Sequence, residues 1–271
     1  MCSSDLQNVW GLASDQRERF VAGEGLERFD AARHQVLVWL GCAGASDATF
    51  QQSLRALFSL LRASGVTFGV LSKERCTGDV AKRTGNEYVF QELAQANIEM
   101  LREAKPLTIV SGCPHCVKTI GDDYRRFGYA VEVVHTAVYL ERLTRSRRAT
   151  SGPETVTFHD PCYLGRYRGE TEAPRALLAR SGSVVVDPAH HGRDTSCCGA
   201  GGGLFFASHE AAHGSRISDQ RLAELEATGA RTVVTACPFC TSMLGGAQAS
   251  AAGATRVVDL VTYVAERLEP S

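Results

Sequence analysis

The sequence has no uninterrupted apolar run of 18 residues, which is about the shortest run that predicts a membrane-spanning helix. The first thirty positions are too polar for a secretory signal peptide. These absences argue against a chain that spans or crosses a membrane unaided. We therefore expect a cytoplasmic protein with no membrane segment of its own.

An excess of charge of one sign is also absent. The chain has 29 basic and 30 acidic residues and a formal net charge of −1. This balance provides no overall electrostatic attraction to nucleic acid or to an acidic membrane surface. We expect no nucleic-acid partner.

Cysteine, in contrast, is abundant, with ten residues in 271. In a chain without a secretory signal this favours metal or redox chemistry over structural disulfides. Cys2 is excluded from the candidate sites, because the opening MCSSDL resembles translated sequencing-adapter sequence. We expect residues 1–6 to pack against nothing and the natural N-terminus to be missing.

An internal repeat organises the chain. GCPHC at 112–116 and ACPFC at 236–240 are 124 positions apart, and the same offset relates VVHTAVYLERL to VVDLVTYVAERL. VWLGC at 38–42 likewise corresponds to FHDPC at 158–162, and CTGD at 76–79 to CCGA at 197–200. Self-similarity in this fixed order indicates a duplicated unit.

Short β-branched runs alternate with helix-patterned stretches such as 48–64 and 85–104 in both halves. The predicted strands are 35–40, 66–72, 107–112, 130–135, 155–160, 183–187, 231–236 and 255–260. The pattern predicts an α/β fold with two similar parallel-sheet halves of about four strands each, related by a pseudo-twofold. The predicted domains are an N-terminal extension over 1–34, partly artefactual or truncated, a first domain over 35–150 and a second over 151–271.

The candidate cysteines follow predicted strands, where parallel α/β folds place their sites. Cys113 and Cys237 each also precede a helix, whose N-terminal dipole favours a thiolate. We therefore predict two sites, one in each half.

The second half offers five thiols: Cys162, Cys197, Cys198, Cys237 and Cys240. Structural zinc takes four ligands, so a fifth thiol points to iron and sulfide. The ligand spacing excludes an ordinary ferredoxin. Beside these thiols, Gly199, Gly201, Gly202 and Gly203 allow close backbone approach, with peptide N–H groups directed at sulfur. His159 and Asp160 either cap the end of a strand or support the ligands.

The order of Cys162, the Cys197–Cys198–Gly199 triplet, Cys237 and Cys240 resembles the cysteine-rich CCG domain. This domain occurs in tandem in heterodisulfide reductase and in iron–sulfur components of glycolate oxidase. The resemblance covers about residues 35–271. CTGD, CPHC and HDPCYLGRY look most similar to membrane-bound iron–sulfur oxidoreductases that link electron-transfer flavoprotein to quinones.

The resemblance implies a non-cubane [4Fe-4S] cluster on the five cysteines of the second half. In the first half Cys42, Cys76, Cys113 and Cys116 match the family pattern, but Thr77 replaces the second cysteine of the pair. Four thiols suit a cubane [4Fe-4S] cluster or a zinc ion. Asp79 is expected to cap a helix or, alternatively, to add an oxygen ligand.

The resemblance further implies an iron–sulfur oxidoreductase module, complete or part of a larger enzyme. We expect electrons to arrive from a flavoprotein or a ferredoxin-type domain and to leave to a quinone or a disulfide. Cys198 is the expected catalytic residue, because the fifth thiol distinguishes the second site from the first. A missing N-terminal region or a partner would then hold the chain at the cytoplasmic face of the membrane.

Two alternatives remain open from the residues alone. CPHC after a strand and before a helix also suits a thioredoxin-like dithiol oxidoreductase, although that leaves five other cysteines unexplained. A zinc-stabilised structural scaffold fits the first half better than the second.

Overall fold

The computed structural model describes residues 15–71, 73–206, 215–250 and 255–269. The chain divides into two compact units, Met1–Thr136 and Ala137–Ser271. Residues 1–6 lie outside the described residues, as does Cys2. The predicted domain boundaries and the pseudo-twofold stay predictions.

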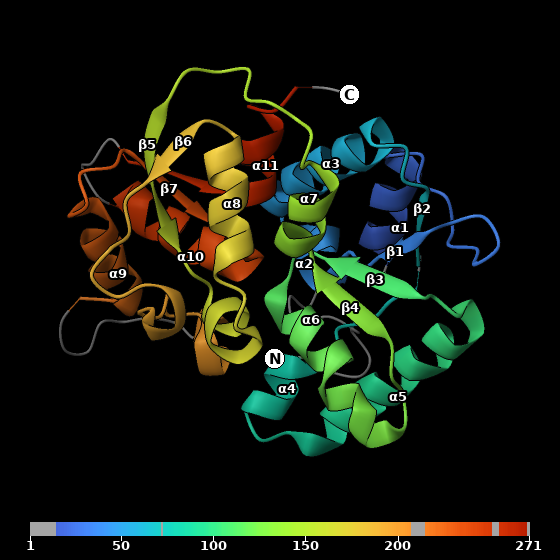
Figure 1. Cartoon of the computed structure of the whole chain (residues 1–271). Coiled ribbons are helices and arrows are strands. Elements are labelled where there is room, and N and C mark those ends of the chain that lie inside the picture. The colour runs from blue at the N-terminus through green and yellow to red at the C-terminus, as the bar shows by residue number, and fades with distance from the viewer. Residues whose placement is uncertain (1–14, 72, 207–214, 251–254, 270–271) are drawn as a thin grey trace. The chain divides into compact units, whose positions relative to one another are not determined.

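Each unit contains one four-stranded sheet in which all pairings are parallel (Figure 1). The first sheet has the order β2-β1-β3-β4 and the second the order β6-β5-β7-β8. The strands are β1 (Val36–Val38), β2 (Phe68–Val70), β3 (Thr108–Ser111), β4 (Glu132–His135), β5 (Glu154–His159), β6 (Ser183–Val185), β7 (Thr232–Thr235) and β8 (Arg256–Asp259). The equivalent order confirms the prediction of two similar parallel-sheet halves.

The central strands are apolar and fully buried. Leu37 and Val38 in β1 and Val233 and Val234 in β7 have no exposed surface. Continuous burial of this kind is expected when helices cover both faces of a parallel sheet. It explains why the strands appear in the sequence as unbroken apolar runs.

In the first unit, α3 (Ala48–Ala63) and α5 (Glu87–Ala104) lie on opposite sides of the sheet (Figure 1). Asp47 caps α3 by accepting the backbone N–H of Phe50, and Asn86 caps α5 by accepting that of Val89. Such caps satisfy N–H groups that the first helical turn leaves unpaired. The other helical segments of this unit are α1 (Asp15–Gly23), α2 (Gly41–Ser46), α4 (Asp79–Arg83), α6 (Pro114–Gly121) and η1 (Asp123–Phe127).

In the second unit, α8 (Glu172–Arg180) packs against α11 (Leu260–Ala265), and α9 (Ile217–Glu226) packs against α10 (Pro238–Ser250). Arg180 donates to the backbone oxygen of Glu141, which ties α7 (Thr136–Leu143) to α8. Shorter helical segments are η2 (Tyr163–Tyr167), η3 (Gly192–Asp194) and η4 (Gly201–Phe206).

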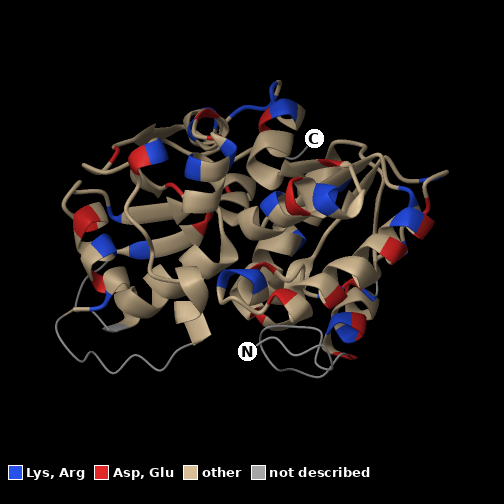
Figure 2. Cartoon of the chain, turned by 90° about the horizontal axis from the view of Figure 1, so that it is seen from below, with Lys and Arg blue, Asp and Glu red and all other residues tan. Residues whose placement is uncertain are grey.

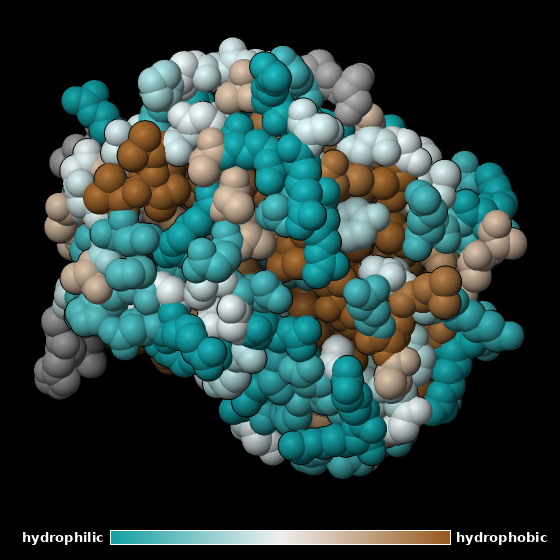
Figure 3. Space-filling view, viewed as in Figure 1, coloured by the Kyte–Doolittle hydropathy of each residue, from teal (hydrophilic) through white to brown (hydrophobic). Residues whose placement is uncertain are grey.

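The edge strands are short. β2 is covered in part by an isolated parallel bridge between Arg28 and Val70. β6 leaves Val184 57% exposed. Figure 3 shows one face of the surface, on which apolar patches lie among mostly hydrophilic side chains.

Basic and acidic residues are interspersed in the view of Figure 2, in line with the balanced composition. Over the described ranges, no helix combines the length and the apolar character that crossing a bilayer requires.

We predict that Leu61→Ala destabilises the first unit by about 2–5 kcal/mol, because Leu61 is fully buried in α3 and its truncation leaves a cavity. Leu107→Ala is the matched control, since Leu107 is 86% exposed and its loss should change stability by less than about 0.5 kcal/mol. The midpoint of urea unfolding measures both. Equal effects would contradict the assigned core.

Candidate metal centres

The cysteines gather around the point in each sheet where the strand order reverses. The chain runs from β1 outward to β2 and then returns to β3 on the other side of β1. Such a switch point leaves a crevice at the carboxyl ends of the two central strands, where α/β proteins bind ligands. Cys42 and Cys113 follow β1 and β3, and Cys162 and Cys237 follow β5 and β7.

A side-chain hydroxyl bridges the two central strands at this point in both halves. Ser111, at the end of β3, donates to the backbone oxygen of Trp39 at 3.2 Å. Thr235, at the end of β7, donates to the backbone oxygen of His159 at 3.1 Å. The loops that carry the first cysteine of each set therefore start from a fixed backbone.

The four thiols of the first half lie together. The pKa of Cys116 is raised by its hydrogen bond with Cys113, by burial, and by its nearness to Cys113, Cys42 and Cys76. All four residues are buried. Cys113 caps α6, with Pro114 at the first helical position, so its sulfur stands at a helix N-terminus as predicted.

A buried carboxylate supports the loop of Cys42. Glu74 accepts the backbone N–H groups of Leu40 and Gly41 at 3.0 and 3.1 Å. Burial raises the pKa of Glu74, and the charge of Arg17 and these hydrogen bonds oppose the rise. Arg17, on α1, also donates to the backbone oxygen of Gly41 at 2.9 Å. A helix within the predicted extension thus contributes to the first site.

The turn after Cys76 has the same form as the turn after Cys197. The N–H of Gly78 lies 3.4 Å from the sulfur of Cys76, and the N–H of Gly199 lies 3.3 Å from that of Cys197. Both glycines have a left-handed φ, +87° and +93°. Thr77, which is buried, therefore occupies the position of Cys198 in the other half.

The expectation that Asp79 caps a helix is wrong. Gly78 holds the N-cap position of α4, and Asp79 is the first helical residue. Its carboxylate lies 2.8 Å from Nδ1 of His115 and 3.4 Å from Nε of Arg83. Asp79 thereby links α4 to the helix that carries Cys116.

The five thiols of the second half form one hydrogen-bonded chain. Cys162 bonds Cys197, Cys197 bonds Cys198, Cys198 bonds Cys240, and Cys240 bonds Cys237. Cys197 accepts from both of its neighbours, which lowers its pKa, whereas the hydrogen bond to Cys197 raises the pKa of Cys198 to about 12. All nine cysteines within the described ranges are free thiols.

Backbone N–H groups of the glycine segment point at these sulfurs. Gly199 and Gly201 donate to Cys197, and Ala200 donates to Cys198. Gly202 and Gly203 have φ values of +64° and +80°. The predicted close backbone approach therefore rests on contacts for Gly199 and Gly201, and on chain direction for Gly202 and Gly203.

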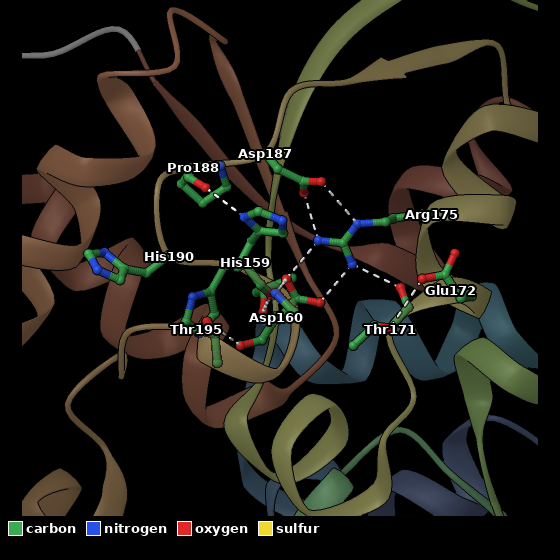
Figure 4. Close-up of polar contacts among 12 residues, drawn as sticks. His159, Asp160, Thr171, Glu172, Arg175, Asp187, Pro188, His190 and Thr195 are labelled. Atoms are coloured by element: carbon green, nitrogen blue, oxygen red, sulfur yellow. Dashed lines mark hydrogen bonds and ion pairs between the residues drawn. The ribbon is translucent and has the colours of Figure 1, made fainter.

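An ion-pair network anchors the loop that leads to Cys162 (Figure 4). Arg175 on α8 donates to both oxygens of Asp160 at 2.8 Å and reaches Asp187 at 2.6 Å. Asp160 is 1% exposed and also accepts the backbone N–H of Gly192 at 2.7 Å. Burial alone would lower the pKa of Arg175, but the two carboxylates raise it above its ordinary value.

His159 lies beside the sulfurs of the second half. A ring nitrogen of His159 and the sulfurs of Cys198 and Cys240 all lie within 4.8 Å of one another. Burial lowers the pKa of His159 to about 3, and the charge of Arg221 adds to the effect. The imidazole is therefore neutral at ordinary pH.

The structure thus brings the predicted cysteines together as a set of four and a set of five. Sequence reasoning missed Glu74, Arg17, Arg175 and Arg221, because each acts on a loop far away along the chain. For Trp39 the sequence does carry one signal, since the repeat pairs VWLGC with FHDPC.

A family model described as "Cysteine-rich domain" and designated CCG matches residues 36–121 and again 156–245. Similar curated proteins are named "Probable membrane-anchored ferredoxin" in Chromohalobacter salexigens, 40% identical over 89% of this chain, and "Probable iron-sulfur-binding oxidoreductase FadF" in Bacillus subtilis, 34% identical over 88%. A third, "EtfAB:quinone oxidoreductase" of Syntrophomonas wolfei, is 32% identical over 97%. The aligned region covers only 37%, 35% and 39% of these proteins.

We predict that Arg175→Met destabilises the second unit by about 3–5 kcal/mol, because it leaves the buried Asp160 carboxylate without its cation. Arg216→Met is the control, since Arg216 and Asp219 form an exposed pair worth about 0–1 kcal/mol. Thermal unfolding of both variants measures the difference. Equal stability of the two variants would show that the network does not hold the Cys162 loop.

Proposed function

This chain belongs to the cysteine-rich CCG-domain family, with one copy of the domain in each half, and on that premise we propose that it is the iron–sulfur electron-transfer module of an oxidoreductase. In this proposal the second half holds the principal cluster and the first half a supporting centre. The relatives named as iron–sulfur and quinone oxidoreductases support this assignment. The activity of the longer proteins is carried over only as part of the proposal.

The observation that carries the proposal is the continuous chain of five cysteine thiols in the second half. A single tetrahedral zinc ion uses four ligands, so the fifth sulfur has no role there. Thiolates are the usual ligands of iron–sulfur clusters. The donor set therefore fits iron and sulfide in the second half.

In the second half Cys162, Cys197, Cys198, Cys237 and Cys240 would hold a [4Fe-4S] cluster, which we propose to be non-cubane. In the first half Cys42, Cys76, Cys113 and Cys116 would hold a cubane [4Fe-4S] cluster or a zinc ion. When bound, an iron–sulfur cluster accepts and releases single electrons.

The protein groups around the sulfurs favour the anionic ligand form. Backbone N–H groups of Gly78, Gly199 and Gly201 are directed at cysteine sulfur, and α6 and α10 begin at the CxxC cysteines. Both features offset negative charge on thiolates. Burial of Cys198, Cys237 and Cys240 keeps water away from these ligands.

We propose that the second half is the side from which electrons reach the acceptor, with Cys198 as its distinguishing residue. The donor would be a flavoprotein or a ferredoxin-type domain, and the acceptor a quinone or a disulfide. We place this exchange at the cytoplasmic face of the membrane, reached through a partner or through a further region of a longer protein.

The dithiol alternative is not favoured by the geometry. Cys113 and Cys116 lie with Cys42 and Cys76 and do not form an isolated pair. Iron and acid-labile sulfide analysis of anaerobically prepared protein separates the alternatives. Two zinc ions and no iron would establish the scaffold alternative and overturn the proposal.

We predict that Cys198→Thr, which makes the second site imitate the first, retains bound iron but changes its electron paramagnetic resonance spectrum. Electron transfer from dithionite-reduced protein to a soluble quinone or disulfide should slow by at least about tenfold, or ~1.4 kcal/mol. An unchanged spectrum and rate, together with loss of turnover in Cys76→Ala, would reverse the roles of the halves.

The reverse change, Thr77→Cys, should add a fifth thiol to the first site. The turns at Gly78 and Gly199 have the same conformation, so the new sulfur would start from the backbone position of Cys198. We predict that the first-site spectrum approaches that of the second. Thr84→Cys, in an exposed position at the end of α4, is the control and should leave the spectrum unchanged.

A further inference from the structure

Each half buries one ring nitrogen for which the structure provides no hydrogen-bond partner. These atoms are Nε1 of Trp39 and Nε2 of His159. Trp39 is fully buried and His159 is 1% exposed. A buried N–H without a partner costs about 1–3 kcal/mol, so its retention calls for a physical reason.

The two residues occupy equivalent positions of the repeat. Each stands three residues before the first cysteine of its set, Cys42 or Cys162. Each backbone oxygen accepts the hydroxyl at the end of the neighbouring strand, from Ser111 or Thr235. The two side chains therefore leave the backbone at the same place relative to the two switch points.

The tautomer of His159 follows from Arg221. Nε of Arg221 donates to Nδ1 of His159 at 3.0 Å. An arginine nitrogen can only donate, so Nδ1 must be the unprotonated nitrogen, and in the neutral ring Nε2 carries the hydrogen.

Arg221 is itself held in place. Its guanidinium donates to the backbone oxygen of His190 at 3.0 Å, to Glu224 at 2.7 Å and to Thr195 at 3.3 Å. Arg221 is 1% exposed. The orientation of the imidazole is thus fixed from behind by a buried, fully engaged cation.

The nearness of His159 to the sulfurs of Cys198 and Cys240 would by itself suggest a metal ligand. A histidine ligand, however, needs a lone pair, and the lone pair on Nδ1 is used by Arg221 while Nε2 carries hydrogen. What His159 can offer the sulfurs is a donor.

Trp39 supports the same role in the first half, because an indole can donate but cannot act as a ligand. A Cβ atom placed on Gly41 would lie 3.5 Å from the sulfur of Cys116 and 4.0 Å from Cδ1 of Trp39, the carbon bonded to Nε1. The pyrrole edge of the indole therefore faces the space beside Cys116.

We infer that His159 Nε2 and Trp39 Nε1 are N–H donors to the sulfur sites of their halves, and that Arg221 is the positioning residue that keeps His159 a donor and not a ligand. The inference rests on the proposed function. Hydrogen bonds to sulfur stabilise the more negative, reduced state of an iron–sulfur centre, so these donors raise its reduction potential.

The first test compares His159→Leu with His159→Gln in the full, iron-loaded chain. We expect both variants to keep their iron, because His159 is not a ligand. The potential of the second-site signal should become more negative in His159→Leu and return toward the parent value in His159→Gln, whose amide again supplies an N–H. Equal potentials in all three proteins would overturn the inference.

Trp39→Phe is the matched test in the first half. It removes the indole N–H, retains an aromatic ring and disturbs no charged group, whereas His159→Leu also leaves Arg221 without an acceptor. If the first site holds a cluster, its signal should shift to a more negative potential while the second-site signal stays unchanged. If the first site holds zinc, its zinc should be lost to a chelator more readily. An unchanged potential, or unchanged zinc loss, would remove Trp39 from the inference.

Pulsed paramagnetic resonance of protein labelled with ¹⁵N-histidine separates a donor from a ligand. A weak nitrogen coupling that disappears in His159→Leu is the expected result. A strong coupling, or loss of iron in His159→Gln, would show that His159 binds iron and would overturn the inference. A parent protein without iron would instead overturn the proposed function, so the two failures are distinguishable.

Discussion

Two parallel strands whose connections leave in opposite directions open a crevice at their carboxyl ends, and the rest of each half is arranged around that crevice. The hydroxyls of Ser111 and Thr235 tie the strands together at its base. The first cysteine and the CxxC pair of each set enter from the two sides of this tie. The remaining thiols, Cys76 and the Cys197–Cys198 pair, arrive on the loops that follow the edge strands β2 and β6.

The sheets could be predicted from the sequence because both of their faces are buried. Runs such as 107–112 and 231–236 are apolar without alternation, and each contains a strand, β3 or β7. The grouping of the cysteines could be predicted for a related reason, since parallel strands bring all their carboxyl ends to one edge. The repeat then allowed each half to support the interpretation of the other.

The supporting side chains could not be predicted, because their partners are distant in sequence and ordinary in type. Arg221 lies 62 positions from His159, and Glu74 lies 33 from Gly41. Arginine on an amphipathic helix usually faces solvent, and nothing in the pattern of α8 or α9 marks Arg175 or Arg221 as buried. Asp79 was assigned to the wrong position because helix α4 begins one residue earlier than its capping pattern suggested.

The short edge strands limit how a redox partner can associate with this chain. β2 and β6 have three residues each, and the segment at Arg28 already pairs with β2. Extending either sheet would add few backbone hydrogen bonds, so strand addition offers little binding energy. Recognition then falls to loops and side chains, which suit small and rapidly dissociating interfaces. A partner that delivers one electron and leaves before the next collision is well matched to such a surface.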